Sequence, residues 1–133
     1  MRAVVDPNVI ISALLSRAGS PAQVLLAWQQ GRFELVISNG LLEELRRALA
    51  YPKLVKRIPP EDAEEVLRWL ARSATVVADP ADDPPLRSED PGDDYLIALA
   101  AAERAALVSG DRHLLALAGR IPVYSSAEFL QLL

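Results

Sequence analysis

The pattern of hydrophobic and polar positions alternates between short apolar runs and longer stretches with helical periodicity. The short, often β-branched runs predict strands at 2–6, 34–37, 75–78, 106–109 and 122–124. The stretches with helical spacing and capping residues predict helices at 9–15, 22–30, 41–50, 60–72, 94–104 and 111–117, and a last one capped by Ser125 and Glu128. Strands that alternate with helices imply parallel pairing with both faces covered. The sequence therefore predicts a three-layer α/β/α sandwich with a central, mostly parallel sheet of four to five strands.

One segment, 79–91, breaks this rhythm. It carries four prolines among many acidic residues and is predicted to be a loop inside the domain, not a boundary between domains. A chain of 133 residues fits one unit, so a single domain is expected over 1–133. Apolar residues make up 51% and charged residues 24%, a globular balance that argues against a disordered protein.

The composition also limits the environment of the protein. The absence of cysteine excludes a disulfide framework and a thiolate metal site, so the cytoplasm is the expected location. The longest apolar run, 95–102, is far shorter than the ~20 residues that a membrane helix needs, so no contact with a membrane is expected. The apolar start of the chain is interrupted at Asp6-Pro7, before a signal sequence can form, and is read as a strand.

Acidic residues follow the ends of predicted strands. Asp6 ends the first strand, and Asp111 follows the fourth with only Gly110 between them. Because the carboxyl ends of parallel strands meet at one edge of a sheet, where α/β proteins bind ligands, we expect both carboxylates at that edge. Asp94 begins the helix that leads to the strand before Asp111, and the loop ahead of it can return it to the same edge.

A further acid lies on the helix 41–50, whose leucines define a buried stripe. Glu44 borders that stripe, whereas Glu43 points away from it. Carboxylates that converge repel one another unless a cation lies between them, and hard oxygen ligands suit Mg²⁺ or Mn²⁺. Each aspartate is also placed where a helix cap belongs. From spacing alone, a shared metal site and a set of separate caps remain alternatives.

Four stretches of the chain carry a resemblance to a known family. They are Val4-Val5-Asp6-Pro7-Asn8-Val9, 38–45 (SNGLLEEL), 90–98 (DPGDDYLIA) and 107–115 (LVSGDRHLL). In these stretches the sequence resembles the PIN domain family, and within it the toxin components of VapC-like toxin–antitoxin pairs. The stretches come in the family order and span nearly the whole chain.

The resemblance implies an acidic pocket that binds Mg²⁺ or Mn²⁺ and an endoribonuclease that hydrolyses RNA phosphodiesters with metal-activated water. Carried over position by position, it assigns the metal-binding and catalytic roles to Asp6, Glu44, Asp94 and Asp111. It also implies an RNA substrate, a cognate antitoxin protein that silences the enzyme, and a homodimer.

The resemblance further implies which residues surround these ligands. Asn8 and Ser109 match polar positions that line the pocket in relatives. Two positions depart from the family pattern: Pro7 removes a backbone N–H near the site, and Gly92 stands where relatives often carry an aspartate. Asp93 and Asp90 are the acids available to take such an outer position.

Other charged residues are weighed against plain structural roles. Arg46, Arg47 and Arg112 are candidates for contacts with RNA phosphates, although a solvated helix face explains the first two equally well. The formal charge of −4 is unusual for a protein that meets a polyanion, but two divalent ions would cancel it. His113, the only histidine, is expected at the surface, and the two tryptophans are expected to pack.

Two other functions stay open. The first is a PIN-fold module with a poorly loaded site that holds RNA or a protein partner without cutting. The second is a phosphoacceptor domain similar to response-regulator receivers, which would need a lysine on a late strand. Both lysines, Lys53 and Lys56, fall mid-chain outside the predicted strands, so this interpretation is disfavoured.

Overall fold

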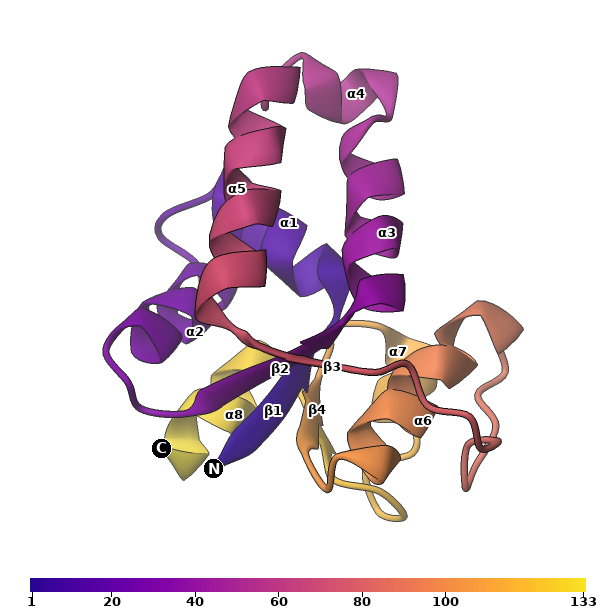
Figure 1. Ribbon diagram of the computed structural model, residues 1–133. Helices are drawn as coiled ribbons and strands as arrows, with labels where there is room; N and C mark the ends of the chain where they lie inside the picture. Colours follow the sequence, from indigo (N-terminus) through magenta and orange to yellow (C-terminus); the bar gives the residue numbers. More distant parts are fainter.

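A five-stranded, wholly parallel sheet forms the centre of the molecule. The computed structural model describes residues 1–133, and Figure 1 shows their arrangement. The strands are β1 (Arg2–Val5), β2 (Glu34–Ser38), β3 (Thr75–Val77), β4 (Ala106–Val108) and β5 (Val123–Tyr124). They lie in the order β3-β2-β1-β4-β5. The predicted α/β/α sandwich is confirmed, and all five expected strands are present.

Helices cover both faces of this sheet. They are α1 (Pro7–Leu15), α2 (Ser20–Gln29), α3 (Asn39–Leu49), α4 (Pro52–Val55), α5 (Pro60–Ser73), α6 (Asp94–Ala102), α7 (Arg112–Leu115) and α8 (Ser126–Leu132), with a 3₁₀ turn, η1 (Pro91–Asp93), before α6. Helix α2 packs against α1 and α8, while α6 packs against β1 and β4. Helices α3 and α5 rise together beyond the sheet, joined by α4 (Figure 1).

The core explains why these residues fold as they do. Residues 3–5 of β1 are fully buried, as a central parallel strand requires. The leucine stripe of α3 faces the core as expected, with Leu41, Leu45 and Leu49 buried. The predicted capping box of Ser125 and Glu128 starts α8.

The tryptophans pack, as predicted. The rings of Trp28 on α2 and Trp69 on α5 lie 4.9 Å apart between centroids and tilted by 46°. Their contact joins α5 to α2.

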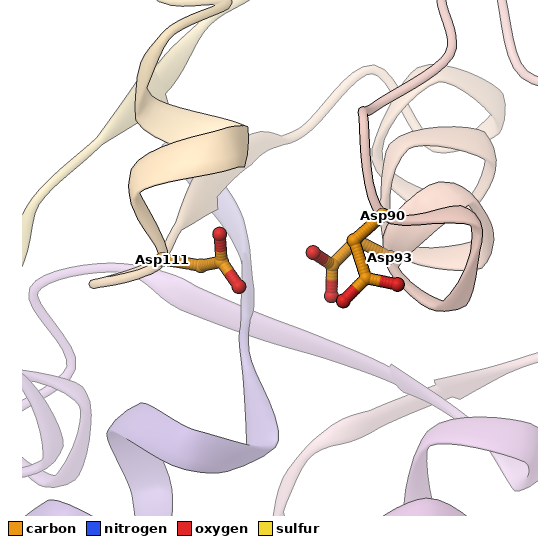
Figure 2. Close-up of side chains that lie close together, drawn as sticks. All are labelled: Asp90, Asp93 and Asp111. Carbon is orange, nitrogen blue, oxygen red and sulfur yellow. The ribbon is translucent and has the colours of Figure 1, made fainter.

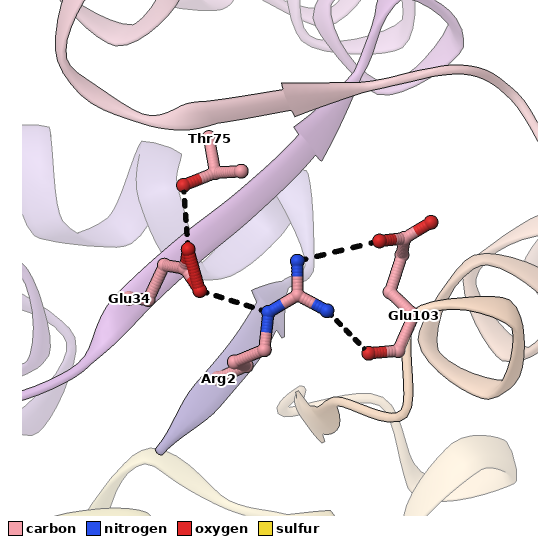
Figure 3. Close-up of polar contacts among 4 residues, drawn as sticks. All are labelled: Arg2, Glu34, Thr75 and Glu103. Carbon is pink, nitrogen blue, oxygen red and sulfur yellow. Dashed lines mark hydrogen bonds and ion pairs between the residues drawn. The ribbon is translucent and has the colours of Figure 1, made fainter.

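Polar contacts fix the amino ends of the strands at the edge opposite the acidic residues. Arg2 Nε donates to Glu34 Oε2 at 2.8 Å, and Thr75 Oγ1 donates to Glu34 Oε1 at 3.0 Å (Figure 3). Arg2 Nη1 also donates to the carbonyl oxygen of Glu103 at 2.6 Å. Arg2, Glu34 and Thr75 begin β1, β2 and β3, and Glu103 follows α6. The network therefore sets the relative register of these three strands.

The strand order reverses between β1 and β4, which lie side by side in the middle of the sheet. Val5 pairs with Val108, and the backbone N–H of Asp6 donates to the carbonyl of Val108 at 2.9 Å. Connections from these two strands therefore leave in opposite directions and open a crevice at their carboxyl ends, the usual ligand site of such sheets.

None of the helices has both the length and the apolar character of a membrane span. Helices α1 and α2 together have the required length and composition, but a bend of 99° separates them.

Candidate metal centre

Asp6 and Asp111 are joined through Ser109 at the crevice between β1 and β4. Ser109 Oγ donates to Asp6 Oδ2 at 2.8 Å and accepts the backbone N–H of Asp111 at 3.0 Å. Asp6 also caps α1, since its Oδ1 accepts the N–H of Asn8 at 3.0 Å. Asp111 caps α7 in the same way, with His113 N at 2.7 Å from its Oδ1. The capping role and the shared site therefore coexist in the same residues.

Asp90 and Asp93 complete a cluster with Asp111. Each of the three offers a carboxylate oxygen, and these oxygens all lie within 4.8 Å of one another. Figure 2 shows the carboxylates of Asp90 and Asp93, from the segment before α6, facing that of Asp111 at the start of α7. Asp90 is exposed, while the other two are partly buried.

Asp93 lies in a strongly negative part of the site. Its Oδ2 is buried and has no hydrogen-bond partner. Burial, followed by the negative charges of Asp111, Asp90 and Asp6, raises the pKa of Asp93 from 3.8 to about 6. No arginine, lysine or histidine lies within ion-pair distance of any of these four aspartates.

Asp6 experiences the same repulsion. It is 4% exposed, and burial is the main reason why its pKa is raised. The hydrogen bonds from Asn8 and Ser109 lower the pKa, while the charges of Asp111 and Glu44 raise it. Asp6 therefore belongs to the same electrostatic unit as the carboxylates of Figure 2.

The structure separates Asp94 from this unit. The sequence expectation placed Asp94 among the metal ligands and Asp93 around them. Asp94 Oδ1 instead accepts the backbone N–H of Ser88 at 2.9 Å, and Oδ2 accepts Arg87 Nη1 at 3.3 Å. Its carboxylate thus holds the preceding loop and already has a cation. The physical reason is the 3₁₀ turn η1, which rotates Asp93 toward Asp111 and Asp94 toward the loop.

Glu44 lies at the border of the cluster. Its charge contributes to the raised pKa of both Asp6 and Tyr95, so it is close to them. Its carboxylate is about half exposed and accepts Arg47 Nη2 at 2.6 Å. Glu43 points outward, as the helical spacing predicted, with 61% of its side chain exposed.

Tyr95 was not foreseen by the sequence. Burial, followed by the charges of Glu44, Asp6 and Asp93, raises the pKa of its phenol. It is therefore a neutral hydroxyl beside the carboxylates. A tyrosine one position after Asp94 carries no sequence signal for this placement.

Asp90 was expected only at an outer position, yet it stands inside the cluster. It caps η1, with its Oδ1 accepting the N–H of Gly92 at 3.0 Å, and Pro91 follows it. This is the same Asp-Pro start that Asp6 and Pro7 make for α1. A Cβ on Gly92 would lie 3.2 Å from Asp90 Oδ1, so a larger residue would press on this carboxylate.

Pro7 does not damage the site. It occupies the first turn of α1, where a backbone N–H has no partner within the helix. The N–H that Asp6 uses comes from Asn8 instead. The departure from the family pattern therefore costs the capping arrangement nothing.

The candidate phosphate-binding arginines differ in their surroundings. Arg46 pairs with Glu64 and with Glu43, and Arg47 pairs with Glu44. Arg112, next to Asp111, is exposed and has no acidic partner. Of the three, Arg112 alone has its charge free.

The donor set fits a divalent cation. Carboxylate oxygens are the ligands that Mg²⁺ and Mn²⁺ prefer. A cation beside Asp93 would satisfy its unpartnered Oδ2 and relieve the repulsion that raises the pKa of Asp93 and Asp6. The residues placed to hold it are Asp90, Asp93 and Asp111, and Asp6 is near enough for its charge to act on Asp93.

Together, the fold and this site define a class: a doubly wound α/β domain that gathers carboxylates where its strand order reverses. The sequence profile of the PIN domain family matches residues 2–113, and the chain belongs to this family. Among solved structures, it is similar to a chain of the crystal structure of VapBC2 from Rickettsia felis bound to a DNA fragment from their promoter. The TM-score is 0.63 at 16% identity, over 94% of this chain and 98% of the other. No curated protein gives a significant match.

Proposed function

We propose that this chain is a metal-dependent endoribonuclease that hydrolyses RNA phosphodiesters and serves as the toxin of a type II toxin–antitoxin pair. The observation that carries the proposal is the buried Asp93 Oδ2, which has no partner within a cluster of carboxylates that lacks any counter-charge. Members of the PIN family are generally nucleases that use divalent metals, and this cluster lies where the fold places a ligand.

Each residue has a defined task in this proposal. Asp6, Asp93 and Asp111 hold Mg²⁺ or Mn²⁺ from inside the crevice, and Asp90 closes the site from its exposed side. Ser109 holds Asp6 and Asp111 in position relative to each other through its two hydrogen bonds. Glu44 stands at the border and can complete the ligand set if Arg47 releases it.

When bound, divalent ions in such a site activate water and stabilise the negative charge that develops on the leaving oxygen. The protein contributes a rigid arrangement, because backbone N–H groups fix the carboxylates of Asp6, Asp90 and Asp111 in helix caps. The free guanidinium of Arg112 lies next in the chain to Asp111 and is placed to contact an RNA phosphate.

The toxin role and its partners rest on the family resemblance. A cognate antitoxin, a homodimer and a cytoplasmic location are proposed on this ground, and the fold shared with a VapBC2 chain supports the first. Large apolar side chains at the surface, such as Leu26, Tyr51 and Leu132, leave room for protein contacts.

Calorimetric titration with Mn²⁺ and Mg²⁺, together with cleavage of single-stranded RNA, tests the proposal. We expect metal binding, and cleavage that a chelator abolishes. Asp6→Asn should lower cleavage by more than about 100-fold, because it removes a buried ligand. Asp62→Asn, an exposed acid in the first turn of α5, is the matched control and should leave both properties unchanged. Absence of metal binding at millimolar concentrations would overturn the proposal.

One observation favours the second reading, a module that binds RNA or a protein without cutting. Glu44 and Asp94, two of the four ligands expected from the sequence, are neutralised within the chain by Arg47 and Arg87. RNA binding measured with and without metal separates the two functions, since a module would bind RNA equally well in both conditions.

A further inference from the structure

Two hollows include acidic residues described above, Glu44 in the first and Asp111 in the second, and they differ sharply in charge. The first, of about 490 Å³, lies between α3, α6 and the loop that follows β3. Its charged lining consists of Glu44, Asp79, Asp82, Asp83, Asp94 and Arg47. Five carboxylates against one guanidinium make this hollow unfavourable for a phosphate backbone.

The second hollow, of about 260 Å³, lies between α1 and the turn after β4. It is lined by Asn8, Val9, Ser12, Gly110 and Asp111. Asp111 is its only carboxylate, and Oδ1 of that side chain already accepts an N–H. A polyanion therefore meets much less negative charge on this side of the cluster.

The side chains of Asn8 and Ser12, which line this second hollow, are free to bond a ligand. Asn8 and Ser12 are one helical turn apart on α1, and both are exposed. Neither side chain takes part in a hydrogen bond with another residue; the contact at Asn8 uses its backbone N–H. Helix α1 carries no charged residue, so it adds no negative charge to this side of the cluster.

Gly110 lines this hollow without contributing a side chain. Its backbone is not left-handed, the only such glycine being Gly31. A Cβ built on Gly110 would meet no atom within 4 Å. A larger side chain at Gly110, next in the chain to Asp111, would therefore extend into space that no protein atom occupies.

We propose that the hollow formed by Asn8, Ser12 and Gly110 binds a ribonucleotide next to the scissile phosphate of single-stranded RNA. The proposal rests on the proposed function and adds the direction from which substrate enters, the α1 side. A carboxamide donates and accepts at once, which suits the edge of an unpaired base, and a hydroxyl suits a 2′-OH or a phosphate oxygen.

The first test fills the hollow. Gly110→Val should leave the melting temperature and the calorimetric metal affinity unchanged but lower kcat/KM for a short mixed-sequence RNA about tenfold or more, mainly through KM. Gly119→Val is the matched control, because Gly119 also has an ordinary backbone and no atom within 4 Å of its Cβ position. A kcat/KM for Gly110→Val within about twofold of this control would overturn the proposal.

The second test reads RNA binding without cleavage, so that it holds even if the chain proves not to be a nuclease. In an Asp93→Asn background, fluorescence anisotropy with the same labelled RNA should show weaker binding once Gly110→Val is added, and no change once Gly119→Val is added. In the parent protein, the double variant Asn8→Ala/Ser12→Ala should cleave the different sequences of the mixed RNA more evenly. Unchanged RNA binding of the Gly110→Val variant would refute the subsite while leaving the proposed function intact.

Discussion

Ser109 Oγ donates to Asp6 Oδ2 at 2.8 Å, although 103 residues separate them in the chain. The contact exists because β1 and β4 are neighbours in the sheet and Val5 pairs with Val108. The pairing of β1 with β4 thus brings the acidic residues together. The hydroxyl of Ser109 connects the ends of the two strands, because it contacts both Asp6 and Asp111.

Ser109→Ala tests this connection. The change removes the donor to Asp6 and the acceptor for the N–H of Asp111, both at a fully buried position. We expect a loss of about 2 kcal/mol in unfolding free energy, the usual magnitude for a hydrogen bond to a charged group, measured by urea denaturation. Metal affinity should fall about 10-fold or more, because Asp6 loses its orientation. Ser73→Ala, at the exposed end of α5, is the control; equal stability of the two variants would contradict the expectation.

Asp93→Asn and Asp94→Asn should separate two neighbouring acids by opposite effects. Asp93→Asn removes a carboxylate that suffers repulsion, so the metal-free protein should become more stable at neutral pH while metal binding is lost. Asp94→Asn weakens the ion pair with Arg87 and the hydrogen bond from the backbone N–H of Ser88. The free energy of unfolding should therefore fall by about 1 kcal/mol while metal still binds. Calorimetry and thermal melts on both variants decide the matter, and a reversed pattern would restore Asp94 as the ligand.

The contribution of Asp93 to the stability of the metal-free protein should fall as the pH rises from about 4 to about 6. Below 3.8, Asp93 is protonated in both states; above that, the unfolded chain ionises first, while the folded protein keeps the proton up to about 6. The stabilising contribution is therefore present at low pH and lost as the pH passes the folded pKa. Two pKa units equal about 3 kcal/mol, and solvent screening of this partly exposed group reduces that to about 1–2 kcal/mol.

Urea denaturation with a chelator present, at about pH 4.5 and about pH 7, measures this difference. Other carboxylates have lowered pKa values, Glu34 and Glu128 among them, and act in the opposite direction. The comparison with Asp93→Asn isolates the one residue, because its stability should lack this component. Excess Mn²⁺ should reverse the trend in the parent. An identical pH dependence in parent and variant would show that Asp93 does not carry the effect.

Much of the fold could be predicted because buried strands and amphipathic helices leave regular patterns. The apolar run before Asp6, the leucine stripe of α3 and the capping box of α8 all formed as expected. Short irregular elements were missed or misjudged. Helix α4 begins at Pro52, after the break that was read as the end of the preceding helix. Helix α7 ends at Leu115, where 117 was expected.

The site was predictable to the level of its edge but not of every side chain. Spacing brought Asp6 and Asp111 to one end of the sheet, which the strand pairing accounts for. The choice between Asp93 and Asp94 depends on the 3₁₀ turn before α6, because adjacent helical positions differ by about 100° in direction. Only the path of the whole loop decides which of them faces Asp111, and no local pattern encodes that path.

The contact between Gly40 and Asp79 gives the last prediction. Both carboxylate oxygens of Asp79 accept the N–H of Gly40, at 3.1 and 3.2 Å, near the start of the helix that carries Glu44. A Cβ on Gly40 would lie 2.7 Å from Asp79 Oδ1, so alanine must displace this carboxylate. In a helix, alanine normally gains up to about 1 kcal/mol over glycine.

We therefore expect Gly40→Ala to bring little or no gain in the parent but about 0.5–1 kcal/mol in an Asp79→Ala background, a coupling of about 1 kcal/mol in a double-mutant cycle. Since Asp79 begins the loop that carries Asp90, both single variants should also weaken metal binding in calorimetry. Effects that add within about 0.3 kcal/mol would show that the two residues act independently. Displacing the carboxylate by alanine, or deleting it, removes the same anchor, so similar losses of metal affinity in both variants would identify Asp79 as the residue that holds Asp90 in place.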